Sequence, residues 1–160
     1  MSALYRTALP FTPAYARDIG FGQYEFRPDV VRGVPLYLYD EAYPGGRRVN
    51  PNAFVIPVEA RQGTAPRNGV RAFPLSQIDL SLKKRVPLGR VRLDVGLDIF
   101  NVFNRPQFDR PEIEVGTSRF GLATQSLANG LGTGANGRGL SPLFQPGGPR
   151  SVQLVVRAGF

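Results

Sequence analysis

The sequence predicts an all-β fold built from antiparallel strands. Apolar residues alternate with polar ones in several segments, which is the period of a strand with one polar face. The 19 Gly and 15 Pro among 160 residues supply frequent turns and argue against a helical bundle. A content of 42% hydrophobic and 11% aromatic residues is enough to build ordered surfaces between those turns.

The composition excludes most catalytic chemistry. The chain has no Cys and no His, so it builds neither disulfides nor the usual zinc, thiol or Ser-His-Asp sites. We therefore expect no enzyme activity, no catalytic residue, no metal site and no cofactor. The net charge of +8 is spread along the chain, and no basic patch is interleaved with aromatic residues, so we expect no nucleic-acid partner.

Four strands are expected, at residues 3–9, 75–86, 91–103 and 151–160. The first is short because Pro10 interrupts its pattern. The second and third alternate throughout and are separated by a turn signal at residues 87–90. The fourth alternates up to Phe160, the last residue.

The second and third strands predict a hairpin. With Leu88 and Gly89 as a two-residue loop, Leu82 pairs with Val95 and Lys83 pairs with Asp94. The same register creates two like-charge pairs, Arg85 with Arg92 and Asp79 with Asp98. Such pairs cost stability, so this face of the hairpin is expected to be wet.

The two sides of the hairpin therefore differ in polarity. In the outer-membrane barrel that the long loops and the family resemblance below imply, one side would contact lipid and the other the lumen. The lipid-facing residues are predicted to be Ile78, Leu80, Leu82, Leu93, Val95, Leu97 and Ile99. The lumen-facing residues are predicted to be Asp79, Lys83, Arg92, Asp94 and Asp98. We interpret the carboxylates of this second group as members of charge pairs rather than as a catalytic acid and base.

The stretches 11–74 and 104–150 show no sustained periodicity, apart from a short strand candidate at 34–39. Loops of this length argue against a compact soluble domain, whereas outer-membrane barrels carry long extracellular loops and short periplasmic turns. We assign both stretches as extracellular loops. Asn101 and Asn104, with the aromatic residues around them, are interpreted as a strand end and an interfacial girdle rather than as a ligand pocket.

Seven segments carry a family resemblance. They read FRPDVV at 26–31, GVPLY at 33–37, VNPNAF at 49–54, IDLSLKK at 78–84, IFNVFNRPQF at 99–108, FG at 120–121 and PRSVQ at 149–153. In this order and spacing they resemble the C-terminal end of a TonB-dependent outer-membrane receptor of the Oar-like group.

The resemblance implies a 22-stranded transmembrane β-barrel that is closed around an N-terminal plug and imports nutrients with energy relayed through TonB. The chain would supply about the last four strands, as a C-terminal fragment without signal peptide or plug. The implied partners are outer-membrane lipid, the rest of the receptor barrel and plug, the barrel-assembly machinery, and TonB only through the missing plug. The C-terminal assembly signal of such barrels is matched at Gln153 and Phe160, but Val155 and Ala158 depart from it.

The alternative is a soluble all-β module that binds an anionic polymer or nucleic acid. That reading requires a second apolar face to cover the first, and the chain offers few strands to supply one. For the isolated chain we expect aggregation, with order confined to residues 77–101 and 151–160 and with both long loops poorly ordered.

Overall fold

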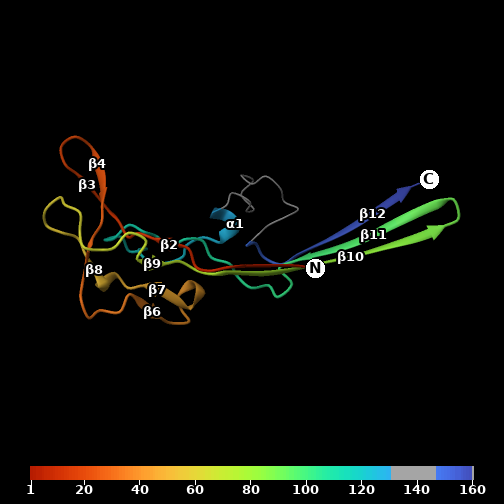
Figure 1. The fold of residues 1–160 in the computed structure, drawn as a ribbon, viewed down its shortest axis with the longest axis horizontal. Helices are drawn as coiled ribbons and strands as arrows, with labels where there is room; N and C mark the ends of the chain where they lie inside the picture. The colour runs from red at the N-terminus through yellow and green to blue at the C-terminus, as the bar shows by residue number, and fades with distance from the viewer. Residues whose placement is uncertain (131–146, 160) are drawn as a thin grey trace. The chain divides into compact units, whose positions relative to one another are not determined.

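The computed structural model describes residues 1–130 and 147–159 and divides into two compact units (Figure 1). Unit 1 comprises Met1–Arg6, Pro74–Gln107 and Ser126–Phe160, and unit 2 comprises Thr7–Phe73 and Phe108–Gln125. The regular elements of both units are mostly strands paired antiparallel, and the fold class is all-β as the sequence predicts. Within the described ranges, no helix is long and apolar enough to cross a membrane.

Unit 1 is a four-stranded antiparallel sheet with one short helix, α1 (Leu127–Gly130). Its strands are β1 (Ser2–Arg6), β10 (Leu75–Leu88), β11 (Val91–Phe100) and β12 (Ser151–Gly159), in that spatial order. The terminal strand pairs with β11, as predicted. β11 ends three residues before its predicted end because Asn101 takes a φ of 49°, which breaks the extended backbone. Phe160 lies outside the described residues.

The predicted register of the hairpin is wrong by two residues. Leu82 pairs with Leu97 rather than Val95, and the two-residue turn is Gly89 and Arg90. Gly89 takes a φ of 64°, which a type II′ turn requires at its first central position. A shift of two residues keeps every side chain on its predicted face.

The corrected register also removes the like-charge pairs that the sequence predicted. Arg85 lies opposite Asp94, and Asp98 lies opposite Ser81. Pro87 lies one residue before Leu88, which pairs with Val91 across the turn, and its backbone nitrogen points away from β11. The lack of an N–H at Pro87 therefore costs the hairpin no hydrogen bond.

Both long connections leave the sheet at one end. Arg6 pairs with Leu75, and Phe100 pairs with Ser151, so residues 7–74 and 101–150 begin and finish there. We call this the loop end, and we call the opposite end, at Gly89 and Arg90, the turn end. β1 pairs with β10 only along residues 75–79. The rest of that edge of β10 has no strand partner among the described residues.

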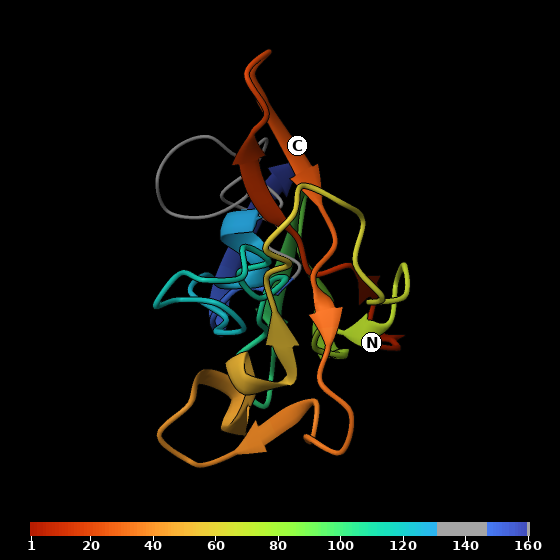
Figure 2. The ribbon, with the colours of Figure 1, turned by 90° about the vertical axis from the view of Figure 1, so that its left-hand side faces the viewer.

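Unit 2 is built from short strands paired two by two (Figure 2). The pairs are β2 (Pro10–Phe11) with β9 (Val70–Arg71), β3 (Tyr15–Asp18) with β4 (Gln23–Phe26), β5 (Asp29–Val30) with β8 (Phe54–Val55), and β6 (Tyr37–Tyr39) with β7 (Arg47–Val49). Two short 3-10 helices, η1 (Pro44–Gly46) and η2 (Pro51–Ala53), flank β7. β6 falls within the strand candidate at 34–39.

The expectation that the two long loops are poorly ordered is wrong for their described residues. Unit 2 has its own core, in which Phe11, Val49, Val70 and Phe120 are almost fully buried. The rings of Phe54 and Phe120 meet edge to face with centroids 5.6 Å apart. Apolar residues scattered without period along the sequence therefore meet in space and form a core that no strand pattern reveals.

Gly121 is one position where this core requires glycine. Its φ is 76°, and a Cβ added there would overlap the carbonyl oxygen of Val49. The close approach lets the Val49 N–H donate to the Gly121 carbonyl at 3.0 Å, while the Gly121 N–H donates to the Glu112 carbonyl at 2.9 Å. The first of these bonds ties residues 108–125 to residues 7–73 within unit 2, and the second lies within residues 108–125.

Candidate functional site

The two faces of the sheet differ sharply in chemistry. Aligned rows such as Leu82, Leu97 and Leu154 cross β10, β11 and β12 on one face. We call this the aliphatic face, and it carries Ile78, Leu80, Leu82, Val86, Leu88, Val91, Leu93, Val95, Leu97, Ile99, Val152, Leu154, Val156 and Ala158, with Lys84 as its one charge on these three strands. All seven residues predicted to face lipid fall on it.

The aliphatic face is open along its length. Leu82 is 55% exposed, Leu154 is 70% exposed and Val156 is 56% exposed. A contiguous apolar surface of this kind marks a site of contact with another apolar phase, because water disfavours its exposure.

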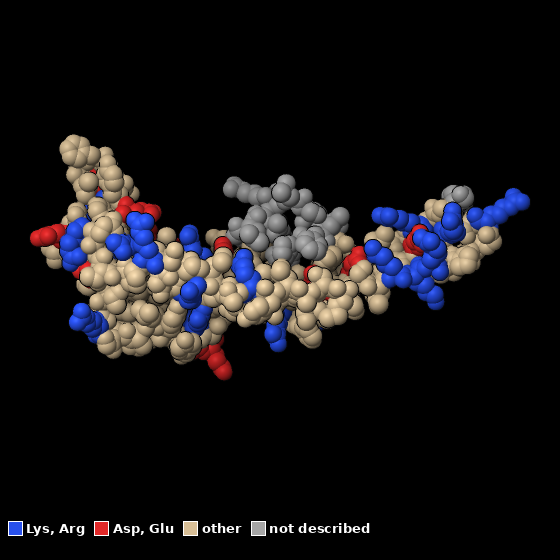
Figure 3. All heavy atoms as spheres, in the orientation of Figure 1, with Lys and Arg blue, Asp and Glu red and all other residues tan. Residues whose placement is uncertain are grey.

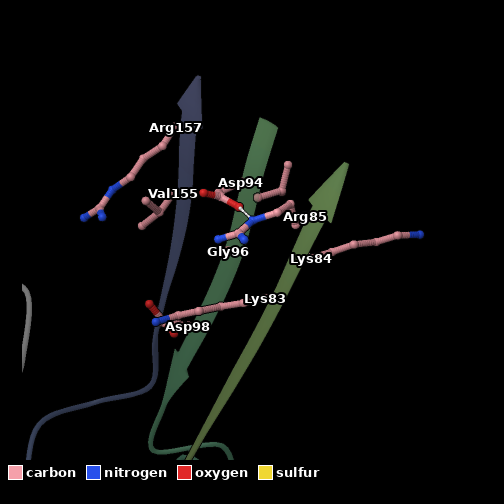
Figure 4. Close-up of a pocket in the computed structure, with 9 residues that line it drawn as sticks. Lys83, Lys84, Arg85, Asp94, Gly96, Asp98, Val155 and Arg157 are labelled. Carbon is pink, nitrogen blue, oxygen red and sulfur yellow. Dashed lines mark hydrogen bonds and ion pairs between the residues drawn. The ribbon is translucent and has the colours of Figure 1, made fainter. Parts of the chain in front are cut away.

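The opposite face is polar. It carries all five residues predicted to face the lumen, Asp79, Lys83, Arg92, Asp94 and Asp98. Asp94 forms an ion pair with Arg85, in which Nε lies 2.7 Å from Oδ1, rather than pairing with Lys83 as predicted. Both side chains are largely exposed, so the pair adds little to stability. Lys83 lies opposite Gly96 and points toward Asp98 (Figure 4).

A hollow of about 430 Å³ lies over this polar face, lined from all three strands by Lys83, Arg85, Asp94, Asp98, Val155, Arg157 and their neighbours. Gly96 forms part of its floor, between Lys83 and Val155. A side chain at Gly96 would meet both neighbours, since an added Cβ would lie 3.7 Å from each. The hollow therefore owes its depth to a glycine in the central strand.

At the loop end, a buried polar network joins β10 to the segments around β11 and β12. Gln77 is 3% exposed and Asn101 is 2% exposed. The Asp79 carboxylate accepts from the backbone N–H of Asn101 at 2.8 Å and from the Gln77 side chain at 2.9 Å. Gln77 in turn accepts from the N–H of Gly147 at 2.7 Å, and Asn101 donates to the carbonyl of Gly148 at 2.8 Å.

The same network fixes the segment that follows β11. The Asn101 side chain donates to the Arg105 carbonyl at 2.9 Å and accepts from the Arg105 N–H at 3.1 Å. Gln107 bonds both the N–H and the carbonyl of Ser76, at 3.1 and 2.7 Å. The Arg150 N–H donates to the Asn104 side chain at 3.1 Å.

Sequence reasoning identified Asn101 and Asn104 as a strand end but missed the network. Both take a φ of 49°, a conformation that Asn tolerates better than most residues. The signal in the sequence is the recurrence of amide side chains directly after a strand, at Asn101, Asn104 and Gln107. Their partners come from segments distant in sequence, so the bonds themselves are visible only in the fold.

Unit 2 contains the second ion pair among the described residues, between Asp29 and Arg61, whose atoms Oδ2 and Nη2 lie 2.5 Å apart. The hydrogen bond from Arg61 lowers the pKa of the Asp29 carboxyl below its ordinary value, and the N–H of Thr64 lowers it further. No group of three or more Asp and Glu residues in the described part of the chain is arranged to hold a metal ion.

The chain matches the family model described as outer membrane beta barrel domain over residues 2–140. It belongs to this family. The protein is thus an outer-membrane β-barrel domain, of a family that is typically non-enzymatic, and its antiparallel sheet is consistent with such a domain. The match includes β1, β10 and β11 and ends before β12. None of the curated proteins and none of the solved structures matches the chain.

Proposed function

We propose that the protein forms the C-terminal part of the barrel of a TonB-dependent receptor that imports nutrients across the outer membrane. In this proposal the aliphatic face contacts lipid and the polar face lines the lumen. The observation that carries it is the sheet with one exposed aliphatic face and one charged face. Barrel strands alternate in this way because lipid lies outside and water inside.

The connections between strands support the same orientation. β10 and β11 are joined by a two-residue turn, while residues 7–74 and 101–150 both leave at the loop end. Outer-membrane barrels combine short periplasmic turns with long extracellular loops. The turn end is then periplasmic and the loop end extracellular.

The segments that resemble TonB-dependent receptors meet at the buried network. Asp79 comes from the segment 78–84, Asn101 and Gln107 come from 99–108, and Arg150 comes from 149–153. These bonds hold the segments that follow β11 and precede β12 against each other and against β10. In the proposal they anchor the extracellular loop between β11 and β12 to the barrel wall.

β12 supplies the expected contact with the barrel-assembly machinery. Its Gln153 lies in the row of Ser81 and Asp98 on the polar face, and its outer edge has no strand partner among the described residues. An open strand edge is a template for pairing with another strand. In the proposal Gln153 and Phe160 form the signal that this machinery reads, and the edge then pairs with the rest of the barrel.

Deletion of the gene in its native host tests the import function. We expect growth and uptake on at least one defined iron or carbon source to fall, and the wild-type gene to restore them. The restored uptake should stop when the inner membrane is de-energised with a protonophore or when TonB is removed. Uptake that continues without inner-membrane energy would indicate a passive pore, and unchanged growth on every source would contradict import.

A further inference from the structure

Charge is unevenly distributed along the polar face. Near the turn end lie four cations, which we call the turn-end cluster: Lys83, Arg85, Arg92 and Arg157. Toward the loop end the same face carries Asp79 and Asp98 together with amide side chains. Blue spheres accordingly gather around the hairpin end of the sheet in Figure 3.

The four cations of the turn-end cluster outnumber the two carboxylates that line the hollow, Asp94 and Asp98. Arg85 is paired with Asp94. Lys83, Arg92 and Arg157 are exposed and have no ion-pair partner within 4.0 Å in the described part of the chain. A surface with a net positive charge that faces a narrow aqueous space concentrates anions there.

The hollow over Gly96 brings part of this cluster to one place. Lys83 and Arg157 flank it from β10 and β12, which lie on either side of β11 and so about 10 Å apart. In Figure 4 these side chains rise on the same side of the strands, and Lys84 points to the other side. A volume of about 430 Å³ is in the range of small-molecule sites.

We infer that the turn-end cluster binds the carboxylate or phosphate group of an anionic small molecule, and that such anionic molecules are the solutes this receptor imports. The second half of the inference rests on the proposed function. Guanidinium and ammonium groups recognise these oxyanions through charge-assisted hydrogen bonds, and Arg157 and Arg92 present the forked geometry that suits them. The size of the hollow favours a small solute over a polypeptide, whose acidic side chains would spread over a larger area.

Adjacent lysines provide a matched pair of variants. Lys83→Gln and Lys84→Gln remove the same charge from neighbouring exposed residues that both border the hollow, but the Lys84 side chain points to the other side of the strand. The intact protein is purified from outer membranes, and binding of inorganic phosphate, citrate and hexaglutamate is measured by calorimetry at low salt. Heat-dependent gel mobility checks that each variant is folded.

We expect saturable binding of phosphate or citrate that weakens as salt is added. Lys83→Gln and Arg157→Gln should each raise the Kd about tenfold, because each removes a hydrogen bond to a charged group. Lys84→Gln should change it less than about twofold. Equal effects of Lys83→Gln and Lys84→Gln, absence of saturable binding, or binding of hexaglutamate alone would overturn the inference.

The outcome also separates this inference from the proposed function. If energised uptake is found but Lys83→Gln binds phosphate and citrate like the wild type, the anion site is wrong and the transport proposal stands. If Lys83→Gln loses anion binding but no uptake is found, the anion site stands, and both import and the assignment of its solutes are wrong.

Discussion

Replacing Leu97 with arginine places a charge near the centre of the aliphatic face. Leu97 is the middle of a row, with Leu82 on one side and Leu154 on the other. β11 has 10 residues, which at about 3.4 Å each and a tilt of about 40° project onto roughly 26 Å of membrane depth. Leu97 then lies about 4 Å from the bilayer midplane, where lipid contact is most complete.

The expected cost follows from this depth. An arginine on the lipid face near the midplane destabilises a barrel by about 2–4 kcal/mol, which is a factor of roughly 30 to 1000 in the folding equilibrium. Ser81→Arg is the control, because Ser81 is exposed on the polar face opposite Asp98. It should change the free energy of unfolding by less than about 0.5 kcal/mol.

The measurement is urea-induced unfolding of the intact protein in phosphatidylcholine liposomes. The reasoning predicts that Leu97→Arg loses stability and that Ser81→Arg does not. Equal losses in the two variants, or a larger loss for Ser81→Arg, would refute the assignment of the faces.

Three further predictions concern the loop end and unit 2. Asn101→Ala should lower the free energy of unfolding by about 2–4 kcal/mol in the same assay, since it leaves buried backbone groups unpaired and puts alanine at a φ of 49°; stability like the wild type would contradict a structural network. Gly121→Ala should expose the core of unit 2 to limited proteolysis at neutral pH. Gly116→Ala is the control, because its φ is also positive but its Cβ would meet only the tip of a side chain. Equal protection of the two variants would show that the close approach at Gly121 is not needed. Because the pKa of Asp29 is lowered by Arg61, its stabilising contribution should be present above the ordinary value of 3.8 and disappear as the pH falls through the lowered pKa. Protease resistance of the wild type and Asp29→Asn should therefore differ at pH 7 and converge in acid, and a difference that persists in acid would contradict this.

The sequence predicted the sheet but not its register. Alternation identified β10, β11 and β12 and divided the residues of the hairpin into the two groups that the sheet places on opposite sides. The register prediction failed because shifting the pairing by two residues leaves every side chain on the same face. The hydrophobic pattern therefore fits both registers equally well. The predicted like-charge pair of Arg85 with Arg92 already indicated that the register was wrong. The positive φ of Gly89 places this residue at the first central position of the turn.

Unit 2 shows where strand periodicity stops being informative. Its strands are two to four residues long, too short for an alternating pattern to stand out. Its order comes instead from contacts between distant residues, such as Phe54 with Phe120, and from the close backbone approach at Gly121. Similarly, the network around Asn101 depends on Gly147 and Gly148, which are more than 40 residues away in sequence.

Accessibility along β11 tests most directly whether the sheet is a membrane wall. The sequence contains no Cys, so a single cysteine can be placed at each position from Val91 to Phe100 of the intact protein in liposomes and spin-labelled without a competing thiol. The account predicts alternation, with odd positions such as Val95 and Leu97 relaxed by lipid-soluble oxygen and even positions such as Asp94 and Asp98 relaxed by a water-soluble nickel complex. Equal access of the nickel complex to both sets, or oxygen access at the even positions instead, would contradict it.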